Sequence, residues 1–243
     1  MYKQRDYVRD FIFPLVTAQK YTGGYTYGGF LGSGFLFGNN GFALTAAHVI
    51  GHVINRVNTS SNDTVAVMFV TEDEKWHAFE VLQAELHPTE DVAILKIDGA
   101  PWKSPFRMRN KWEGSSAQYH MFGYPEDAVY DLINPAEGLI APRPDLVYNA
   151  GYIRRRISFN PGIPGVRGEN FFELSEIAGL GCSGSPLYIL NNRVWDVIGI
   201  YVGEKTNSRG TSVSYGVRED AFRDWTPSIL GTSILEESQN YSV

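Results

Sequence analysis

The sequence predicts an all-β protein, and three observations support this prediction. Short β-prone runs separated by glycines fill the first third of the chain, a pattern typical of strands joined by turns. Two of these runs, at 32–38 and 42–45, are joined by Asn39-Asn40-Gly41, a tripeptide that favours the positive φ angles of a tight hairpin. With 243 residues and 43% hydrophobic content, the chain can bury one large all-β core or two smaller ones.

The remaining elements follow in chain order. We expect strands at 11–18, 65–70, 76–81, 92–97 and 152–159, with a loop or hairpin at 21–29. The segment 131–164 is dense in proline and glycine, so we predict surface loops there. Residues 219–225 resemble a short amphipathic helix, and the polar tail after Gly231 is expected to be partly disordered.

Composition excludes several functional classes. The formal net charge of -6 gives no reason to expect a nucleic-acid partner. The single cysteine, Cys182, allows no internal disulfide, so the fold must be stable through packing alone. No run has the length of a membrane span or the pattern of a signal peptide. We therefore expect a soluble cytoplasmic protein without a membrane partner, or a secreted one if the chain is a processed form.

The strand at 152–159 contains three consecutive arginines, Arg154, Arg155 and Arg156. They could form a patch for a polyanion or a protein partner. A solvated strand whose arginines contact nearby acids is the interpretation we favour, because charge runs are usually solvated faces.

One hexapeptide, Gly-Cys-Ser-Gly-Ser-Pro at 181–186, has the composition of a nucleophile turn. Glycines on both sides of Ser183 tolerate positive φ angles and close approach, so the hydroxyl can be exposed while backbone N–H groups converge beside it. A serine nucleophile beside an oxyanion hole needs this layout. A plain hairpin turn is the alternative interpretation of the hexapeptide alone.

Two upstream stretches supply the partners that a serine nucleophile needs. His48 follows a predicted strand and two small alanines, so its imidazole is expected to emerge from the strand end in a fixed orientation. Asp91 begins the apolar run 92–97, where a partly desolvated carboxylate is costly unless it is paired. Glu90 is its competitor, and alternation along the strand does not decide between the two. His52 is spaced for a metal site with His48, but Val49 stands where a zinc peptidase needs glutamate, so no metal is predicted.

In the order His48, Asp91, Ser183, these stretches resemble the trypsin-like, chymotrypsin-fold serine peptidases, especially the disulfide-free bacterial branch of HtrA-type and glutamyl endopeptidases. The resemblance covers roughly 29–217. It implies two antiparallel six-stranded β-barrels and a short C-terminal helix in a single peptidase domain. The expected division is an N-terminal barrel at 1–115, a C-terminal barrel and helix at 116–230, and a tail at 231–243.

The resemblance also implies roles for these residues. Ser183 would attack the scissile carbonyl, His48 would take and return the proton, and Asp91 would orient the ring. The N–H groups of Gly181 and Ser183 would form the oxyanion hole. No metal or cofactor is implied.

Departures from the family pattern are informative. Cys182 stands where secreted animal members carry the aspartate that binds a new N-terminus, so we predict no activation of that kind. Viral relatives use a cysteine nucleophile, but Cys182 lies one position before the nucleophile slot and its side chain should point away. Ser185 is displaced from that slot by two positions.

The resemblance places the S1 pocket, which holds the residue before the scissile bond (P1), among Ile177, Ala178, Tyr201, Val202 and Gly203. No acid stands at Ile177, which disfavours an Arg or Lys preference, and Tyr201 replaces the histidine of glutamyl endopeptidases. An apolar or small P1 residue is therefore expected.

The chain is thus predicted to be a serine endopeptidase that forms a covalent acyl-enzyme and cleaves protein or peptide substrates. A catalytically silent binding module of the same fold is the alternative from another class, and hydrolysis of other acyl substrates is a third. We also expect either narrow specificity or activation by a regulatory protein partner, since an unrestrained peptidase would damage its own compartment.

Overall fold

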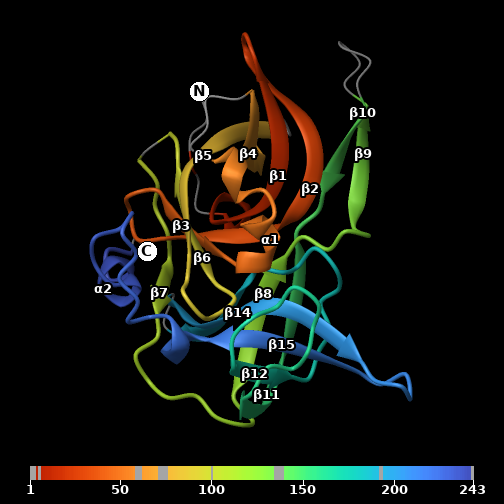
Figure 1. Cartoon of the computed structure of the whole chain (residues 1–243), viewed down its shortest axis with the longest axis vertical. Helices are drawn as coiled ribbons and strands as arrows, with labels where there is room; N and C mark the ends of the chain where they lie inside the picture. The colour runs from red at the N-terminus through yellow and green to blue at the C-terminus, as the bar shows by residue number, and fades with distance from the viewer. Residues whose placement is uncertain are drawn as a thin grey trace.

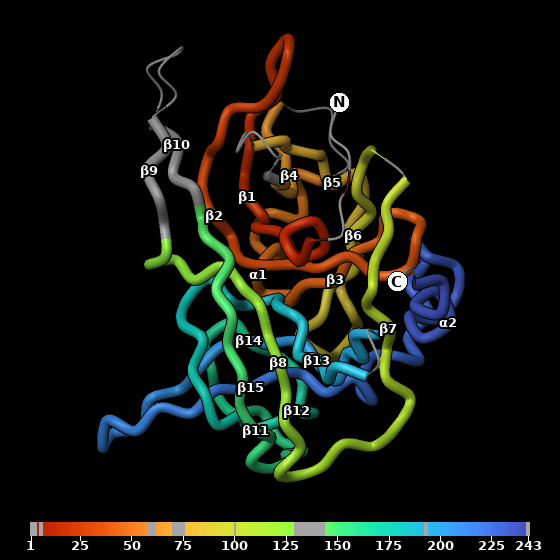
Figure 2. The backbone as a smooth tube through the Cα atoms, turned by 180° about the vertical axis from the view of Figure 1, so that it is seen from behind, coloured from red at the N-terminus to blue at the C-terminus, as the bar shows by residue number. Residues whose placement is uncertain are grey.

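Two β-barrels, one above the other, make up the molecule (Figure 1). The computed structural model describes residues 4, 7–57, 62–70, 76–99, 101–133, 140–191 and 194–241. Figures 1 and 2 show the short helix α1 (Ala47–Gly51) at the level where the two barrels meet. This junction is where the predicted site residues lie, so the fold is described with respect to it.

The N-terminal barrel is closed by six antiparallel strands in the order β1-β2-β3-β6-β5-β4. Their bounds are β1 (Ile12–Tyr21), β2 (Gly24–Phe37), β3 (Phe42–Thr45), β4 (Asp63–Val70), β5 (Trp76–Leu86) and β6 (Ala93–Ile97). The predicted hairpin joins β2 to β3, and Gly38 and Gly41 flank its turn with φ of 63° and 72°. Large apolar side chains fill the interior; for example, Phe69 stacks on Trp102 with ring centroids 4.8 Å apart.

The C-terminal barrel also has six strands. Their bounds are β8 (Gln118–Gly123), β11 (Val147–Ser158), β12 (Asn170–Leu174), β13 (Pro186–Asn191), β14 (Val194–Thr206) and β15 (Ser212–Arg218). They run in the order β13-β8-β11-β12-β15-β14, and the pairing of β13 with β14 closes the ring. The additional strand β7 (Phe106–Met108) pairs in parallel with β14. The prediction of two six-stranded antiparallel barrels is therefore confirmed.

The segment predicted as surface loops at 131–164 contains strands, so that expectation is wrong in part. Strands β9 (Val129–Ile133) and β10 (Ile140–Pro144) pair with each other in a two-stranded ribbon separate from the sheets of both barrels (Figure 1). The next strand, β11, belongs to the barrel. Proline is tolerated in such a two-stranded ribbon because each strand is an edge, where a missing N–H need not break a ladder.

The C-terminal helix forms later in the chain than predicted. Residues 219–225 begin with only a single 3-10 turn, η3 (Glu219–Ala221), whereas the α-helix α2 (Ile234–Ser238) lies in the tail that was expected to be disordered. Ser233 and Glu236 form a reciprocal capping box at its start, and Ile234 is fully buried. Ser238 Oγ accepts the N–H of Met108 in β7 at 3.0 Å, which fastens the helix to the body.

Two further 3-10 turns, η1 (Val8–Asp10) and η2 (Ile54–Arg56), complete the helical elements of the described residues. Within those residues, every helix is too short to span the apolar layer of a bilayer.

Candidate active site

His48 lies in α1, directly after β3, and not at the end of a strand as predicted. Ala46 and Ala47 are buried, 0% and 3% exposed, so only small side chains fit where the chain turns from strand to helix. This turn carries the imidazole to the barrel junction, where its side chain remains 23% exposed.

Asp91 holds His48 through two hydrogen bonds. Asp91 Oδ2 lies 2.6 Å from His48 Nδ1, and Oδ1 accepts the backbone N–H of His48 at 2.9 Å. The Asp91 side chain is fully buried in the loop between β5 and β6. An ionised carboxylate only accepts, so in the neutral tautomer that fits this contact Nδ1 carries the proton and Nε2 has the lone pair. The ring is therefore oriented as a proton acceptor.

Glu90, the competitor of Asp91, has a different partner. It is only 5% exposed, so it is not an exposed loop acid. Its carboxylate accepts hydrogen bonds from Nδ2 of Asn170 at 2.8 Å and from the backbone N–H of Glu169 at 3.3 Å. Glu90 therefore connects the Asp91 loop to the C-terminal barrel, and Asp91 is the carboxylate that binds His48.

Ser183 lies in the turn between β12 and β13, at the same junction. Its carbonyl oxygen and the side chain of Val49, the residue after His48, both border Gly32, where a Cβ atom would meet each of them at about 3.0 Å. The hydroxyl of Ser183 donates to the carbonyl oxygen of Val202 at 3.2 Å. Among the described residues it makes no hydrogen bond to His48. The nucleophile turn therefore borders the histidine helix, while the hydroxyl faces β14.

Gly181 and Ser183 have unengaged backbone N–H groups: neither donates to any other group in the described part of the chain. Gly181 has φ of +90°, and a Cβ there would lie 2.6 Å from the carbonyl oxygen of Tyr124. Only glycine fits this conformation and this space. Free N–H groups beside a serine hydroxyl can receive an oxyanion.

Cys182 points away from this turn. It is 2% exposed, and its Sγ donates to the carbonyl oxygen of Ala178 at 3.2 Å. Burial raises the pKa of the Cys182 thiol to about 12. At neutral pH the group is therefore a thiol and not a nucleophilic thiolate.

The residues predicted to line the S1 pocket gather around Tyr201. Its side chain is 1% exposed, and its hydroxyl accepts the N–H of Ala178 at 3.3 Å. Val202 is also buried, Ile177 is 43% exposed, and Gly203 lies beside the hydroxyl of Ser183. Tyr201 thus lies beneath the loop that precedes the nucleophile.

Sequence reasoning missed Ser33 as a residue of this site. Ser33 lies in β2, is fully buried, and makes hydrogen bonds to both Gly181 and Ser183. The signal available in the sequence was its position between Gly32 and Gly34, where two glycines leave room for another backbone. That pattern alone does not identify the partner.

His87 has a structural role in the turn before Asp91. Its Nδ1 accepts the N–H groups of Thr89 and Glu90 at 3.2 and 2.9 Å, and its ring packs edge-on against Trp225. Burial lowers the pKa of His87. A neutral His87 thus shapes the turn that leads to Asp91.

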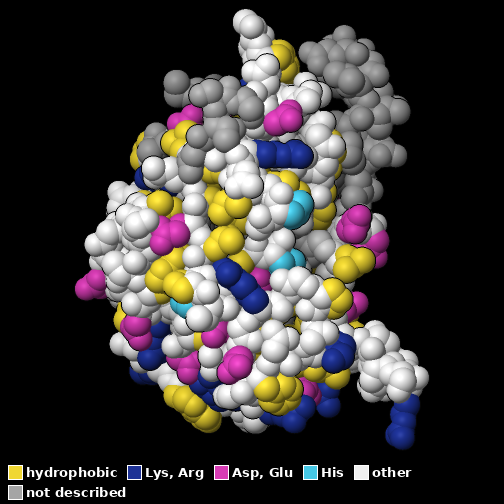
Figure 3. All heavy atoms as spheres, viewed as in Figure 1, with side chains coloured by type: hydrophobic (Ala, Val, Ile, Leu, Met, Phe, Trp, Pro, Cys, Tyr) yellow, Lys and Arg dark blue, Asp and Glu magenta, His cyan; other side chains and the backbone are white. Residues whose placement is uncertain are grey.

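The three consecutive arginines pair with acids. Arg154 and Arg155 lie 3.3 and 2.7 Å from Glu173, and Arg156 forms an ion pair with Asp220. Figure 3 shows acidic and basic side chains interspersed over the lower barrel. The favoured interpretation, a strand whose arginines contact nearby acids, is confirmed.

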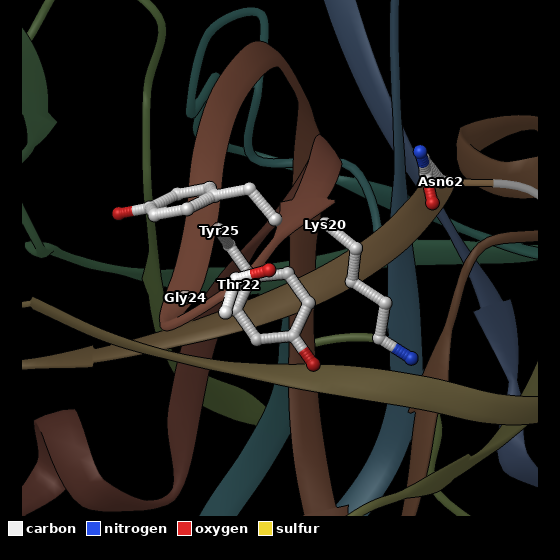
Figure 4. A pocket seen from close by; sticks show the side chains of 6 residues that line it. Lys20, Thr22, Gly24, Tyr25 and Asn62 are labelled. Carbon is white, nitrogen blue, oxygen red and sulfur yellow. The ribbon is translucent and has the colours of Figure 1, made fainter.

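A hollow with a volume of about 480 Å³ lies elsewhere, around the tip of the β1–β2 hairpin (Figure 4). Lys20, Thr22, Tyr25 and Asn62 are among its lining residues, and no predicted site residue takes part. Within the described ranges, no three His, Cys, Asp or Glu side chains are grouped as a metal ion would require.

Comparison with family models gives one match: a trypsin-like peptidase domain matches residues 32–200. The matched range includes His48, Asp91 and Ser183. No curated protein matches the chain.

Several solved structures share the fold. The MamO protease domain from Magnetospirillum magneticum is 16% identical with a TM-score of 0.55, and the match covers 86% of this chain and 92% of that one. The Rv3671c protease from M. tuberculosis in its active form is 17% identical with a TM-score of 0.52, covering 86% and 75%. The HtrA-type protease AlgW, solved with a decapeptide, is 16% identical with a TM-score of 0.54, covering 86% and 61%. At these identities the likeness concerns the fold alone.

Proposed function

The chain belongs to the family of trypsin-like peptidases, and from this premise we propose that it is a serine endopeptidase in which Ser183 is the nucleophile. His48 is the general base and Asp91 its orienting carboxylate. The observation that carries the proposal is the pair of hydrogen bonds that Asp91 accepts from His48, at 2.6 Å from Nδ1 and 2.9 Å from the backbone N–H, which leaves Nε2 free to accept a proton.

The reaction begins when the hydroxyl of Ser183 rotates from Val202 towards the imidazole. Exchanging one hydrogen bond for another costs little, about 1 kcal/mol or less. The oxygen then attacks the scissile carbonyl carbon while Nε2 of His48 takes the proton. The oxyanion that forms is bound by the N–H groups of Gly181 and Ser183.

Collapse of this intermediate breaks the C–N bond. His48 returns its proton to the departing amine, and the acyl group remains on Ser183 as an ester. A water molecule, deprotonated by the same imidazole, attacks the ester and releases the second product, which restores the serine hydroxyl. No proton or electron is gained or lost over the cycle.

The side chain of Tyr201 supports a small P1 residue. A large ring that is 1% exposed lies under the loop predicted to form the pocket wall, and its hydroxyl is tied to Ala178. Volume occupied by this ring is not available to a substrate side chain. We therefore propose a preference for alanine, serine or glycine at P1.

The loop between β11 and β12 supports narrow specificity. A Cβ at Gly165 would lie 3.6 Å from Cβ of His48, and Ile163 lies beside Gly203. Lys205 Nζ donates to the carbonyl oxygen of Pro161 at 2.7 Å, so the loop is fastened across this side of the site. We propose that the substrate, or a regulatory protein partner, must displace or fit this loop. Rapid cleavage of unfolded casein by the chain alone would contradict this.

One observation favours a second candidate, the silent binding module. The hydroxyl of Ser183 is bonded to Val202 and not to His48. If this arrangement were permanent, the serine would not be activated.

Labelling of the full chain by a fluorophosphonate probe separates the two candidates. An active peptidase incorporates the probe, and Ser183→Ala abolishes the incorporation. Ser185→Ala serves as the matched control, because Ser185 belongs to the same hexapeptide but is fully buried, so labelling should persist. Absence of labelling in the wild-type chain, with peptide substrates also uncleaved, would favour the silent module.

A further inference from the structure

Ser33 connects three segments of the molecule through its own hydrogen bonds. Its hydroxyl donates to the carbonyl oxygen of Gly181 at 3.0 Å and accepts the N–H of Tyr124 at 3.0 Å. Its backbone N–H donates to the carbonyl oxygen of Ser183 at 2.8 Å, and its carbonyl accepts the hydroxyl of Thr45 at 2.7 Å. A fully buried serine with four such bonds is a fixed point of the junction.

The backbone at Gly181 needs hydrogen bonds to fix it, because a glycine has little intrinsic preference among several φ and ψ angles. Its φ of +90° is one of several conformations that glycine adopts at low cost. The N–H that would receive the oxyanion belongs to the peptide unit that joins Leu180 to Gly181. Its direction depends on what holds that unit and the next one.

One hydrogen bond holds each of the two peptide units that meet at Gly181. The carbonyl oxygen of Leu180 accepts the N–H of Glu126 at 2.7 Å. Because the carbonyl and the N–H of a planar trans unit point in opposite directions, this bond turns the N–H of Gly181 away from Glu126. The hydroxyl of Ser33 fixes the following unit through the carbonyl of Gly181. Because both peptide units are fixed, the N–H of Gly181 keeps one direction.

We propose that Ser33 is the positioning residue of the oxyanion hole: its buried hydroxyl holds the Gly181–Cys182 peptide so that the Gly181 N–H stays aimed at the reacting carbonyl oxygen. Ser33 does not touch the substrate. This inference rests on the proposed function.

Ser104 provides a matched control. It is also fully buried, its hydroxyl also donates to one backbone carbonyl, that of Leu36 at 2.7 Å, and it also accepts one backbone N–H, that of Phe106 at 3.1 Å. None of its hydrogen bonds involves the nucleophile turn. Ser33→Ala and Ser104→Ala therefore remove the same kind of interaction and differ in what it positions.

The test measures both variants and the wild type on a peptide with alanine at P1, with active sites counted by fluorophosphonate titration. For Ser33→Ala we expect kcat per active site to fall about 10- to 100-fold. This decrease does not exceed the one caused by removing an oxyanion-hole donor itself. KM should change by less than about 3-fold. A peptidyl boronic acid, which mimics the tetrahedral intermediate, should bind more weakly by the same factor as the loss in kcat/KM. Ser33→Cys, with a weaker donor, should lie between. Ser104→Ala should keep the wild-type kcat per active site.

An unchanged kcat per active site in Ser33→Ala, or boronic acid affinity that does not follow kcat/KM, would overturn the inference and leave the peptidase intact. Ser33→Ala could also lower total activity only because fewer molecules titrate as active enzyme, with kcat per active site unchanged. That result would give Ser33 a purely structural role and would also overturn the inference. A wild-type chain that neither reacts with the probe nor cleaves peptide would overturn the proposed function and, with it, this inference.

Discussion

Nδ2 of Asn170 donates a hydrogen bond to Oε1 of Glu90 at 2.8 Å, across the junction of the two barrels. Oδ1 of the same amide accepts from Nη2 of Arg218 at 2.7 Å. The amide of Asn170 is thus oriented by one acceptor and one donor. Since Glu90 precedes Asp91, this contact connects the histidine–aspartate pair with the barrel that carries Ser183.

Exchange of the two groups at this contact tests its role. In Glu90→Gln the amide oxygen still accepts the backbone N–H of Glu169, so the amide nitrogen meets Nδ2 of Asn170 as a second donor, and in Asn170→Asp a carboxylate meets the carboxylate of Glu90. Each change should therefore lower the free energy of unfolding by about 1 to 3 kcal/mol. The double variant places a donor at 90 and an acceptor at 170, and should recover part of the loss. Urea unfolding of the four proteins gives the coupling energy, and simple additivity of the two losses would contradict the contact.

Residues such as Glu90 and Asn170 show what a single sequence leaves out. They are 80 residues apart, and Ser33 lies 148 residues from the Gly181 carbonyl that it binds. Hydrophobic alternation and turn composition act over a few residues, so they predicted the β2–β3 hairpin and the strands of the first barrel. They did not decide between Glu90 and Asp91, because that choice depends on which distant group each carboxylate meets: His48 for Asp91 and Asn170 for Glu90.

Other differences had readable signals. The Ser233 and Glu236 capping box that begins α2 is visible in the sequence, but the polar composition of the tail favoured disorder. Ile234 is fully buried, and this packing stabilises a helix that the polar composition of the tail did not predict. Prolines predicted loops around 131–164, whereas a two-stranded ribbon tolerates them.

Replacement of Tyr201 tests the proposed preference for a small P1 residue. Tyr201→Val empties most of the ring volume under Ala178, so kcat/KM for a peptide with leucine or phenylalanine at P1 should rise relative to alanine by roughly 10-fold or more. The measurement is the ratio of kcat/KM for the large P1 residue to kcat/KM for alanine, because this ratio does not depend on the fraction of folded enzyme.

Tyr188→Val is the control for that change. Tyr188 is an equally buried tyrosine that stacks on Trp195 with ring centroids 4.8 Å apart, and it contacts a different part of the barrel. A similar cavity there should lower stability without altering the P1 ratio. Equal shifts in both variants would contradict a pocket role for Tyr201.

Thiol reagents test the state of Cys182. Because burial raises its pKa to about 12, iodoacetamide at neutral pH should alkylate the folded chain very slowly and leave fluorophosphonate labelling unchanged. The same chain in urea should take up one equivalent, since the sequence has one cysteine. Rapid alkylation of the folded chain with loss of labelling would point to a cysteine nucleophile.

Glu219, in η3, makes the stability of the fold depend on pH. Its side chain is fully buried, and neither carboxyl oxygen has a hydrogen-bond partner among the described residues. Arg223 stays 3.9 Å away. Burial, with a contribution from the charge of Asp220, raises the pKa of Glu219 to about 8. The folded protein therefore keeps this proton at neutral pH.

The unfolded chain releases the same proton near the ordinary value of 4.5. The stabilising contribution of protonated Glu219 is thus complete below that pH and declines as the pH rises to about 8, by up to about 1.4 kcal/mol per pH unit. Glu219→Gln carries no charge at any pH, so its free energy of unfolding should vary less between about pH 5 and 8 and should exceed that of the wild type at the upper end. Asp224→Asn, at a neighbouring carboxylate that is 75% exposed, should leave the profile unchanged. Urea unfolding at several pH values measures all three, and parallel profiles for Glu219→Gln and the wild type would show that Glu219 is charged in the folded protein.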